Sequence, residues 1–493
     1  MKRIKYLIPL VALLFFSCED YLGDNINPNA PSPDQVTPNL QLATAQTASY
    51  REISRNMNRL GNFFMNNWGI NVNSFAATNP QEYSLQLDNN FYTSIWDNTM
   101  LNTSNFTSII NHPAANYDNH KAIAMIMKSY YFQYLVDIYG DIPYFQIHRG
   151  SENLTPAYDD DQVVYRALYD QLDEAIMMID NASASVNAVG SEDVIFAGDM
   201  DSWKRLANTI KLRLLLRQSD MTDADTMTYL NDKFTNDLAT AQFLNSDATI
   251  NPGYSSSTAE RQNPFYNLMY ETNDAEKDAH RYFRASKYMG DLLNNTGDPR
   301  RGLIFQTFSG QVQGVIQGDV SQNGGGTAPA SISALGAGIV VDHSQDGYIM
   351  TYAESLFLQA EAAHKGYLGG NPQALFDMAI EASCNQLGTT EGGYVGYINT
   401  QVGKGYAVGT PAQKVEAIMY QKNIALQGSV NAMESFIEYT RTGLIDNIPM
   451  ATGSTKPNKP RRLLYPTSEY VGNSANVPAQ GDIYSEGPFW FNH

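Results

Sequence analysis

The sequence predicts a mainly α-helical fold built from paired helices and long irregular loops. Apolar residues recur at three- and four-residue steps in segments spread along the 493 residues, which is the period of an amphipathic helix. Two pairs of such segments share one layout, in which a helix that ends at glycine precedes a helix with small or apolar residues at +4 and +7. Small residues at these steps let two helices approach closely, as in tetratricopeptide helix pairs.

Residues 1–17 have the composition of a secretory signal. A basic start, MKRIKY, precedes the apolar run LIPLVALLFF, which is too short to span a bilayer as a helix. Cys18 follows directly and is one of two cysteines, so a disulfide framework is excluded. Its position resembles that of the acylated cysteine of a bacterial lipoprotein. The alternative is a plain secretory signal followed by an unmodified cysteine.

The next segment, 18–39, is rich in Asn, Pro and Asp and predicts an extended tether. Helical periodicity begins near Leu40 and continues to the NNWG at 66–69, so we expect one folded domain over 40–493. A second helix is expected over 91–111.

The first helix pair is predicted over 120–140 and 159–180. Gly140 closes its first helix as a C-cap. Asp159 is the expected N-cap of its second helix, with Gln162 three residues on completing a capping box.

The second helix pair is predicted over 347–366 and 371–388. Asn371 is its expected N-cap, and Pro372 suits the first helical position. The remaining assignments are helices over 199–218 and 410–428 and long loops over the Gly-, Gln- and Ser-rich stretches 297–347 and 388–410.

Charge and motif content exclude several classes of function. The chain carries 32 basic and 51 acidic residues, a net charge of −19, which disfavours binding to nucleic acid. It contains no HExxH, no GxSxG and no phosphate-binding loop, so we expect neither an enzyme nor a cofactor, and calcium is the one ion that stays open. The run Asp159 to Asp161 lacks the spacing of a calcium loop and is explained by helix capping.

Two segments offer the side chains that recognise sugars, namely an aromatic face and short polar groups. MNNWGINVNSF and NPQEYS supply Asn67, Trp68, Asn71, Gln81 and Tyr83. The alternative is that Trp68 packs against a helix end while the asparagines cap turns.

A third segment, AHRYFRASKYMG at 279–290, offers Arg281 and Tyr282 beside the long loops. Arginine next to tyrosine can bind a carboxylate or stack beneath a sugar ring, so this segment suits a peptide as well as a glycan. The alternative is an amphipathic helix with a solvated basic face.

Eight segments in collinear order carry a resemblance that covers nearly the whole chain. They are Cys18 with Glu19-Asp20, INPNAP (26–31), YYFQYLVDIYGDIPY (130–144), WKRLANTIKLRLLLR (203–217), YAESLFLQAEAA (352–363), QKNIALQG (421–428), YTRTG (439–443) and PRRLLYPTSEY (460–470). In this order they resemble the SusD/RagB family of nutrient-binding outer-membrane lipoproteins.

The resemblance implies a SusD-like fold, with tetratricopeptide-like helix pairs on one side and irregular loops on the other. It also implies a lipid-anchored, surface-exposed protein of the outer membrane that passes an oligosaccharide or a peptide to a SusC-like TonB-dependent transporter. A surface glycoside hydrolase or peptidase and a non-binding helical scaffold are the alternatives from other classes.

Overall fold

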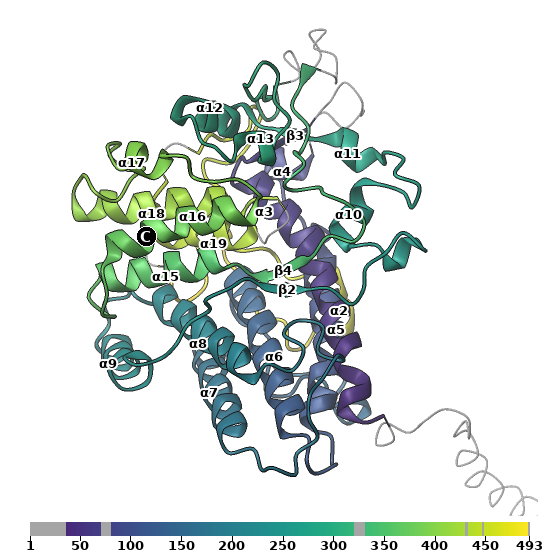
Figure 1. Ribbon diagram of the computed structural model, residues 1–493. Helices are drawn as coiled ribbons and strands as arrows, with labels where there is room; N and C mark the ends of the chain where they lie inside the picture. Colours follow the sequence, from purple (N-terminus) through teal and green to yellow (C-terminus); the bar gives the residue numbers. More distant parts are fainter. Residues whose placement is uncertain (1–35, 71–79, 320–330, 429–431, 446–447, 492–493) are drawn as a thin grey trace, which may run out of the picture.

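The structure, a computed structural model, describes residues 36–70, 80–319, 331–428, 432–445 and 448–491. Helices dominate it (Figure 1). The longer helices are α2 Pro38–Glu52, α3 Asn58–Phe64, α5 Thr93–Ile110, α6 Asp118–Tyr139, α7 Asp161–Asp180, α8 Met200–Arg217, α9 Ala224–Asp232, α12 Lys287–Thr296, α15 Tyr352–His364, α16 Pro372–Gln386, α18 Pro411–Leu426 and α19 Ala432–Thr442.

Short elements connect these helices. The short helices are α4 Gln81–Ser84, α10 Pro264–Met269, α11 Asp278–Tyr282, α13 Arg301–Ile304, α17 Tyr394–Ile398 and α20 Thr467–Gly472. The 3₁₀ and π turns are η2 Ile53–Met57, η3 Gly150–Glu152, η4 Lys233–Leu238 and η5 Ala259–Arg261. The strands are β1 Trp68–Ile70, β2 Ala248–Ile250, β3 Phe283–Ala285 and β4 Gly347–Met350.

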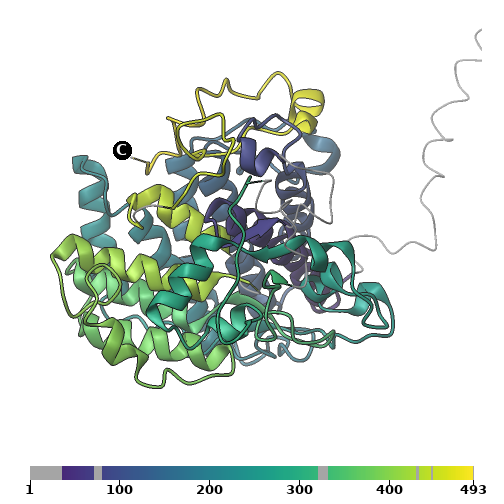
Figure 2. The same ribbon diagram turned by 90° about the horizontal axis from the view of Figure 1, so that it is seen from above.

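The long helices and the short elements occupy different parts of the molecule. Helices α6 to α8 and α15 to α19 stack in the lower and left parts of Figure 1, whereas α10 to α13 and their long connections lie above and to the right. In the view of Figure 2 the teal connections around α10 and α11 lie at one edge of the molecule. No helix among the described residues combines the length and the apolar character needed to cross a membrane.

Both predicted helix pairs are present, since α6 packs along α7 and α15 along α16. The predicted contact face of α7 is confirmed, because Leu168, Leu172 and Ala175 are fully buried. The predicted face of α16, formed by Leu375, Ala379 and Ala382, is confirmed only at Ala379, which is fully buried. Leu375 and Ala382 are partly buried, and Phe376 and Ile380 fill the core beside Ala379 instead.

Helix ends follow the sequence signals with one exception. Gly140 ends α6 with a φ of +85°, a conformation that L side chains rarely adopt. Asn371 caps α16 as predicted. The cap of α7, however, is Asp160, whose side chain accepts from the backbone N–H of Val163, and not Asp159. Asp159 accepts instead from the backbone N–H groups of residues 144 and 145, so its carboxylate fixes the preceding turn.

Two predicted helices begin or continue as strands. The segment predicted as a helix over 347–366 starts with β4, which pairs antiparallel with β2, and becomes helical only at Tyr352. The segment 279–290 divides into the end of α11, the strand β3 and the start of α12. Strand β3 pairs with β1, so Trp68 lies opposite Ala285.

A buried network of charged side chains joins the helix pairs. Arg217 on α8 contacts Glu434 at 2.8 Å and Glu438 at 2.6 Å on α19. Arg441, also on α19, contacts Glu361 on α15 at 2.8 Å. All five side chains are buried. A buried charge is costly unless it is paired, so these contacts specify how α8, α15 and α19 are placed together.

A second, smaller core lies beneath the short elements. It contains Phe63 at the end of α3, Trp68, Tyr83, Phe265 of α10 and Phe283 of β3. The rings of Trp68 and Phe283 lie 5.2 Å apart, and those of Trp68 and Phe265 lie 6.2 Å apart. This core attaches β1, β3 and α10 to the end of α3.

Candidate functional site

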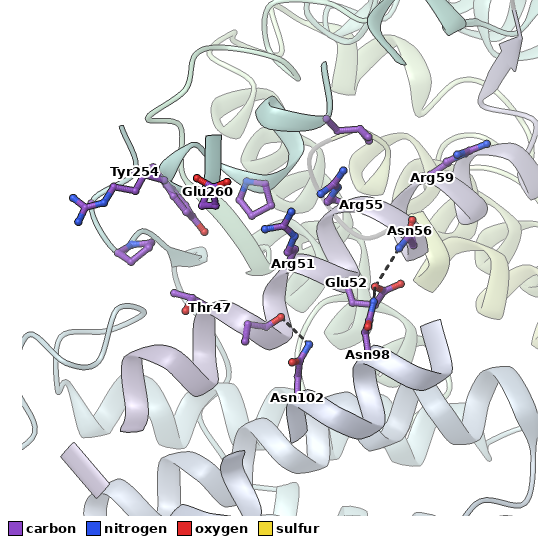
Figure 3. A pocket seen from close by; sticks show the side chains of 16 residues that line it. Thr47, Arg51, Glu52, Arg55, Asn56, Arg59, Asn98, Asn102, Tyr254 and Glu260 are labelled. Atoms are coloured by element: carbon purple, nitrogen blue, oxygen red, sulfur yellow. Dashed lines mark hydrogen bonds between the residues drawn. The ribbon is translucent and has the colours of Figure 1, made fainter. Parts of the chain in front are cut away.

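A large polar hollow lies between α2, α5 and the connection that leads into α10 (Figure 3). Its volume is about 880 Å³, within the range of small-molecule sites in proteins. Its lining residues are Thr47, Ala48, Arg51, Glu52, Arg55, Asn56, Arg59, Asn98, Asn102, Pro252, Gly253, Tyr254, Glu260, Arg261, Pro264 and Leu268. We refer to it as the arginine pocket.

Three arginines come to this pocket from consecutive helical turns. Arg51 lies in the last turn of α2, Arg55 in the π-helical turn η2 and Arg59 in α3. Side chains four residues apart lie on one face of a helix, so the chain sequence RxxxRxxxR places all three along the same side. Figure 3 shows Arg51 and Arg55 in the middle of the pocket and Arg59 at its far end.

Arg59 is enclosed by aromatic rings and a carboxylate. Its guanidinium lies 3.2 Å from Glu82 and within 6 Å of the ring centroids of Tyr92 at 5.6 Å and Tyr282 at 5.9 Å. Burial acts against the charge, but Tyr92 and Glu82 outweigh it and raise the pKa of Arg59. Arg59 therefore joins the arginine pocket to the second core.

Arg51 and Arg55 have a different environment. Arg51 is exposed and Arg55 is half-buried. Burial, followed by the positive charge of Arg51, lowers the pKa of Arg55. Among the described residues neither side chain forms an ion pair.

Glu52 lies in the floor of the pocket and is held by neutral donors. Its carboxylate accepts from the side-chain amides of Asn98 at 3.0 Å and Asn56 at 3.1 Å, and from the Ser94 hydroxyl at 3.4 Å. Burial raises the pKa of Glu52, and these hydrogen bonds oppose the shift. The same contacts fix the two amides, which face the pocket from η2 and α5 (Figure 3).

The opposite wall comes from residues 252–268. Pro252, Pro264 and Leu268 supply apolar surface, and Tyr254 supplies a half-buried ring. Its hydroxyl is buried and has no hydrogen-bond partner among the described residues, and this burial raises the pKa of Tyr254. The pocket thus offers cations and amides on one side and an aromatic and apolar wall on the other. This combination suits a polar ligand with hydroxyl groups.

Three of the predicted ligand-binding residues are buried, which corrects that prediction. Trp68 and Asn67 have no exposed surface, and Tyr83 is 1% exposed. Asn67 exchanges amide hydrogen bonds with Asn423 at 3.2 Å, and the Tyr83 hydroxyl accepts from the backbone N–H of Ile70 at 2.8 Å. A ring without exposed surface cannot stack on a sugar, so Trp68 belongs to the core, as the alternative interpretation held.

The other predicted residues fall into two groups. Gln81 is half-buried and donates to Asp88 at 3.1 Å. Arg281 is exposed and lies 3.7 Å from Asp278. Tyr282 is half-buried beside Arg59. These three stay predictions. Asn71 and Cys18 lie outside the described residues.

The pocket residues were missed although the sequence contains a signal for them. The stretch YREISRNMNRL places arginine at every fourth position of a predicted helix, and this charge pattern indicates a positively charged face. The opposite wall offers no such signal, because Tyr254 and Pro264 belong to an irregular connection whose path depends on the tertiary fold.

One cluster of carboxylates lies elsewhere, at the start of α7. Oxygens of Asp141, Asp160 and Asp161 lie within 4.8 Å of one another. The fold uses all three, because Asp160 caps α7, Asp141 accepts from the N–H of Asp161, and Asp161 accepts from the N–H of Phe489. Helix capping and these backbone contacts account for the cluster without a metal ion.

Known proteins share this architecture. A chitin-binding SusD homologue from Flavobacterium johnsoniae is 24% identical, with a TM-score of 0.72, over 92% of this chain and 97% of that one. A SusD/RagB family protein from Bacteroides thetaiotaomicron VPI-5482 is 21% identical, with a TM-score of 0.72, over 92% of this chain and 99% of that one.

Another structure, described as a chitin-binding protein, is 23% identical, with a TM-score of 0.70, over 93% of this chain and all of that one. No curated protein sequence matches the chain. The sequence model of a SusD-like family, described as starch-binding and associating with the outer membrane, matches residues 28–466. The chain therefore belongs to the SusD-like family and has its mainly α-helical fold.

Proposed function

We propose that this protein binds oligosaccharides at the cell surface and delivers them to a SusC-like TonB-dependent transporter in the outer membrane. The arginine pocket is the observation that carries the proposal, because its amides, arginines and Tyr254 can bind hydroxyl groups and a sugar ring. The description of its family and the chitin-binding SusD homologues of the same fold support a glycan as the ligand class.

Delivery depends on the N-terminal segment. Acylation of Cys18 anchors the chain, Glu19-Asp20 directs it to the cell surface, and the segment from residue 18 to the start of α2 at Pro38 tethers the domain beside the transporter. Tethering raises the local concentration of captured ligand at the transporter, so a modest affinity is sufficient. Tilting of the domain about this tether then passes the ligand inward.

A ligand-capture experiment tests the proposal. Purified protein is mixed with oligosaccharides and peptides, and mass spectrometry identifies the species that are bound and those that are released. We expect oligosaccharides to be retained at their original mass. Released fragments would instead identify an enzyme. Retention of peptides alone would make the ligand a peptide and not an oligosaccharide, and retention of nothing would indicate a scaffold.

A pair of variants assigns the binding to the arginine pocket. Thr47 lines the pocket from α2, and Thr47→Trp places a large ring in it. Thr44 lies three residues earlier on the same helix and is exposed outside the pocket, so Thr44→Trp is the matched control. Capture should be lost in the first variant and kept in the second. Equal capture by both variants would place the ligand elsewhere.

A further inference from the structure

The arginine pocket concentrates positive charge on a strongly acidic protein. Four arginines and two glutamates line it, although the chain as a whole carries a net charge of −19. Arg51 and Arg55 are four residues apart on one helical face, where like charges repel each other. A helix keeps such a pair at a cost in stability, which an anion placed between the two guanidinium groups would remove.

Three buried arginines that hold the fold together are each paired with a carboxylate. Arg213 lies 3.0 Å from Glu354, Arg300 lies 2.7 Å from Asp298, and Arg217 lies 2.8 Å from Glu434. Arg59 at the end of the pocket has Glu82. Arg51 and Arg55 form no such ion pair within the described part of the chain. They differ from the structural arginines in lining an open pocket.

The carboxylates of the pocket act on this pair only at longer range. Glu52 interacts electrostatically with Arg55 and Glu260 with Arg51, but neither carboxylate forms an ion pair with them among the described residues. Glu52 is directed at amide donors, with Asn98 at 3.0 Å and Asn56 at 3.1 Å. Glu260 is exposed on the opposite wall, and no ion pair joins it to an arginine among the described residues. The positive charge at Arg51 and Arg55 is therefore directed toward the space that a ligand would fill (Figure 3).

We infer that the oligosaccharide bound in the arginine pocket is acidic, and that Arg51 and Arg55 bind its carboxylate or sulfate groups. The inference rests on the proposed function and names the ligand class. Guanidinium groups bind oxyanions through paired, charge-assisted hydrogen bonds. Asn98, Asn102 and Thr47 supply short polar groups for hydroxyls. These polar neighbours favour an acidic glycan over an acidic peptide.

Isothermal titration calorimetry on the full chain tests the inference. The acidic probes are tetrasaccharides of galacturonate, alginate, hyaluronan and a sulfated galactan. The neutral probes are the methyl ester of the galacturonate and a chito-oligosaccharide, and tetraglutamate is the peptide probe. We expect at least one acidic glycan to bind about tenfold or more tightly than every neutral probe. The galacturonate and galactan arms distinguish carboxylate from sulfate.

Variants of the two arginines assign the preference to the proposed groups. Arg51→Gln combined with Arg55→Gln should reduce the affinity for the acidic glycan to that of the neutral probes. Arg55→Lys keeps the charge but loses the fork geometry and should lie between the two. Arg149 is exposed and does not line the pocket, so Arg149→Gln is the matched control and should bind as the wild type does.

The outcomes separate the inference from the proposed function. Neutral glycans that bind as tightly as every acidic one would overturn the inference and leave the proposed function standing. No binding of any glycan would overturn both. Tightest binding of tetraglutamate would replace the glycan by an acidic peptide. A preference for acidic glycans that survives in the double variant would remove Arg51 and Arg55 from the site.

Discussion

At the scale of single residues, the protonation of His148 affects the stability of the fold at low pH. Its Nε2 lies 2.7 Å from the Met100 carbonyl oxygen and its Nδ1 lies 2.9 Å from the Thr107 hydroxyl. A carbonyl only accepts, so Nε2 carries the proton and Nδ1 accepts from Thr107. Burial lowers the pKa of His148 to about 4, because the neutral ring is the form that fits this environment.

This depressed pKa predicts a loss of stability on acidification. Between pH 6.5 and about 4 the unfolded chain takes up a proton at His148 that the folded chain does not, so the free energy of unfolding falls as pH falls. His148→Gln does not titrate and should lose about 2 kcal/mol less over that interval. Chemical denaturation at pH 7 and pH 4.5 measures the difference. Equal losses in the two proteins would contradict the assignment.

At the scale of elements, the packing of α3 against α19 depends on one glycine. A Cβ added at Gly61 would lie 2.3 Å from the backbone carbon of Ala432 and 2.3 Å from the backbone nitrogen of Met433. Backbone atoms cannot move aside as a flexible side chain can. Helix α3 therefore approaches α19 more closely than any residue with a side chain would allow, and it continues directly from the turn that supplies Arg55.

Gly61→Ala should force these two helices apart. We expect the free energy of unfolding to fall by about 1 to 3 kcal/mol, which is typical of overpacking in a core. Gly396 in α17 is also helical but has no atom within 4 Å of an added Cβ, so Gly396→Ala is the control and should be neutral or slightly stabilising. Thermal unfolding of both variants measures the effect. Equal melting temperatures would show that α3 and α19 can separate without cost.

Trp68 acts at the same scale, through the elements that it holds together. Its ring packs on Phe265, and the same helix α10 contributes Pro264 and Leu268 to the wall of the arginine pocket. The residue predicted to contact ligand is therefore a positioning residue for the wall that the ligand would contact. Its effect on binding would come through α10.

At the scale of the whole molecule, the proposed attachment to the membrane depends on Cys18. Cys18→Ala removes the proposed acylation site and should release the protein from the membrane fraction of cells that lack the transporter. Cys384, the other cysteine, is buried in α16, so Cys384→Ala is the control and should stay in the membrane fraction. Fractionation followed by immunoblotting measures both. If the Cys18 variant still sediments with the outer membrane, another anchor exists.

The sequence predicted the long helices well and the pocket poorly, for physical reasons. Helices such as α7 carry their period and their caps locally, within about twenty residues. The four residues GYIM are too few to distinguish the period of a strand from that of a helix, so β4 was assigned to a helix, and only its pairing with β2 decides. The pocket joins residues 47–59 to residues 252–268, and nothing local to either segment indicates that contact.

The buried arginines between the helices and the two arginines of the pocket should also respond differently to ionic strength. The charges that join α8, α15 and α19 are buried with their partners, where dissolved ions do not reach them. Arg51 and Arg55 face an open pocket. There dissolved ions screen their charges, with a screening length of about 8 Å in physiological salt. At high salt concentration the helices should therefore keep their arrangement, while the affinity for an anionic ligand should fall.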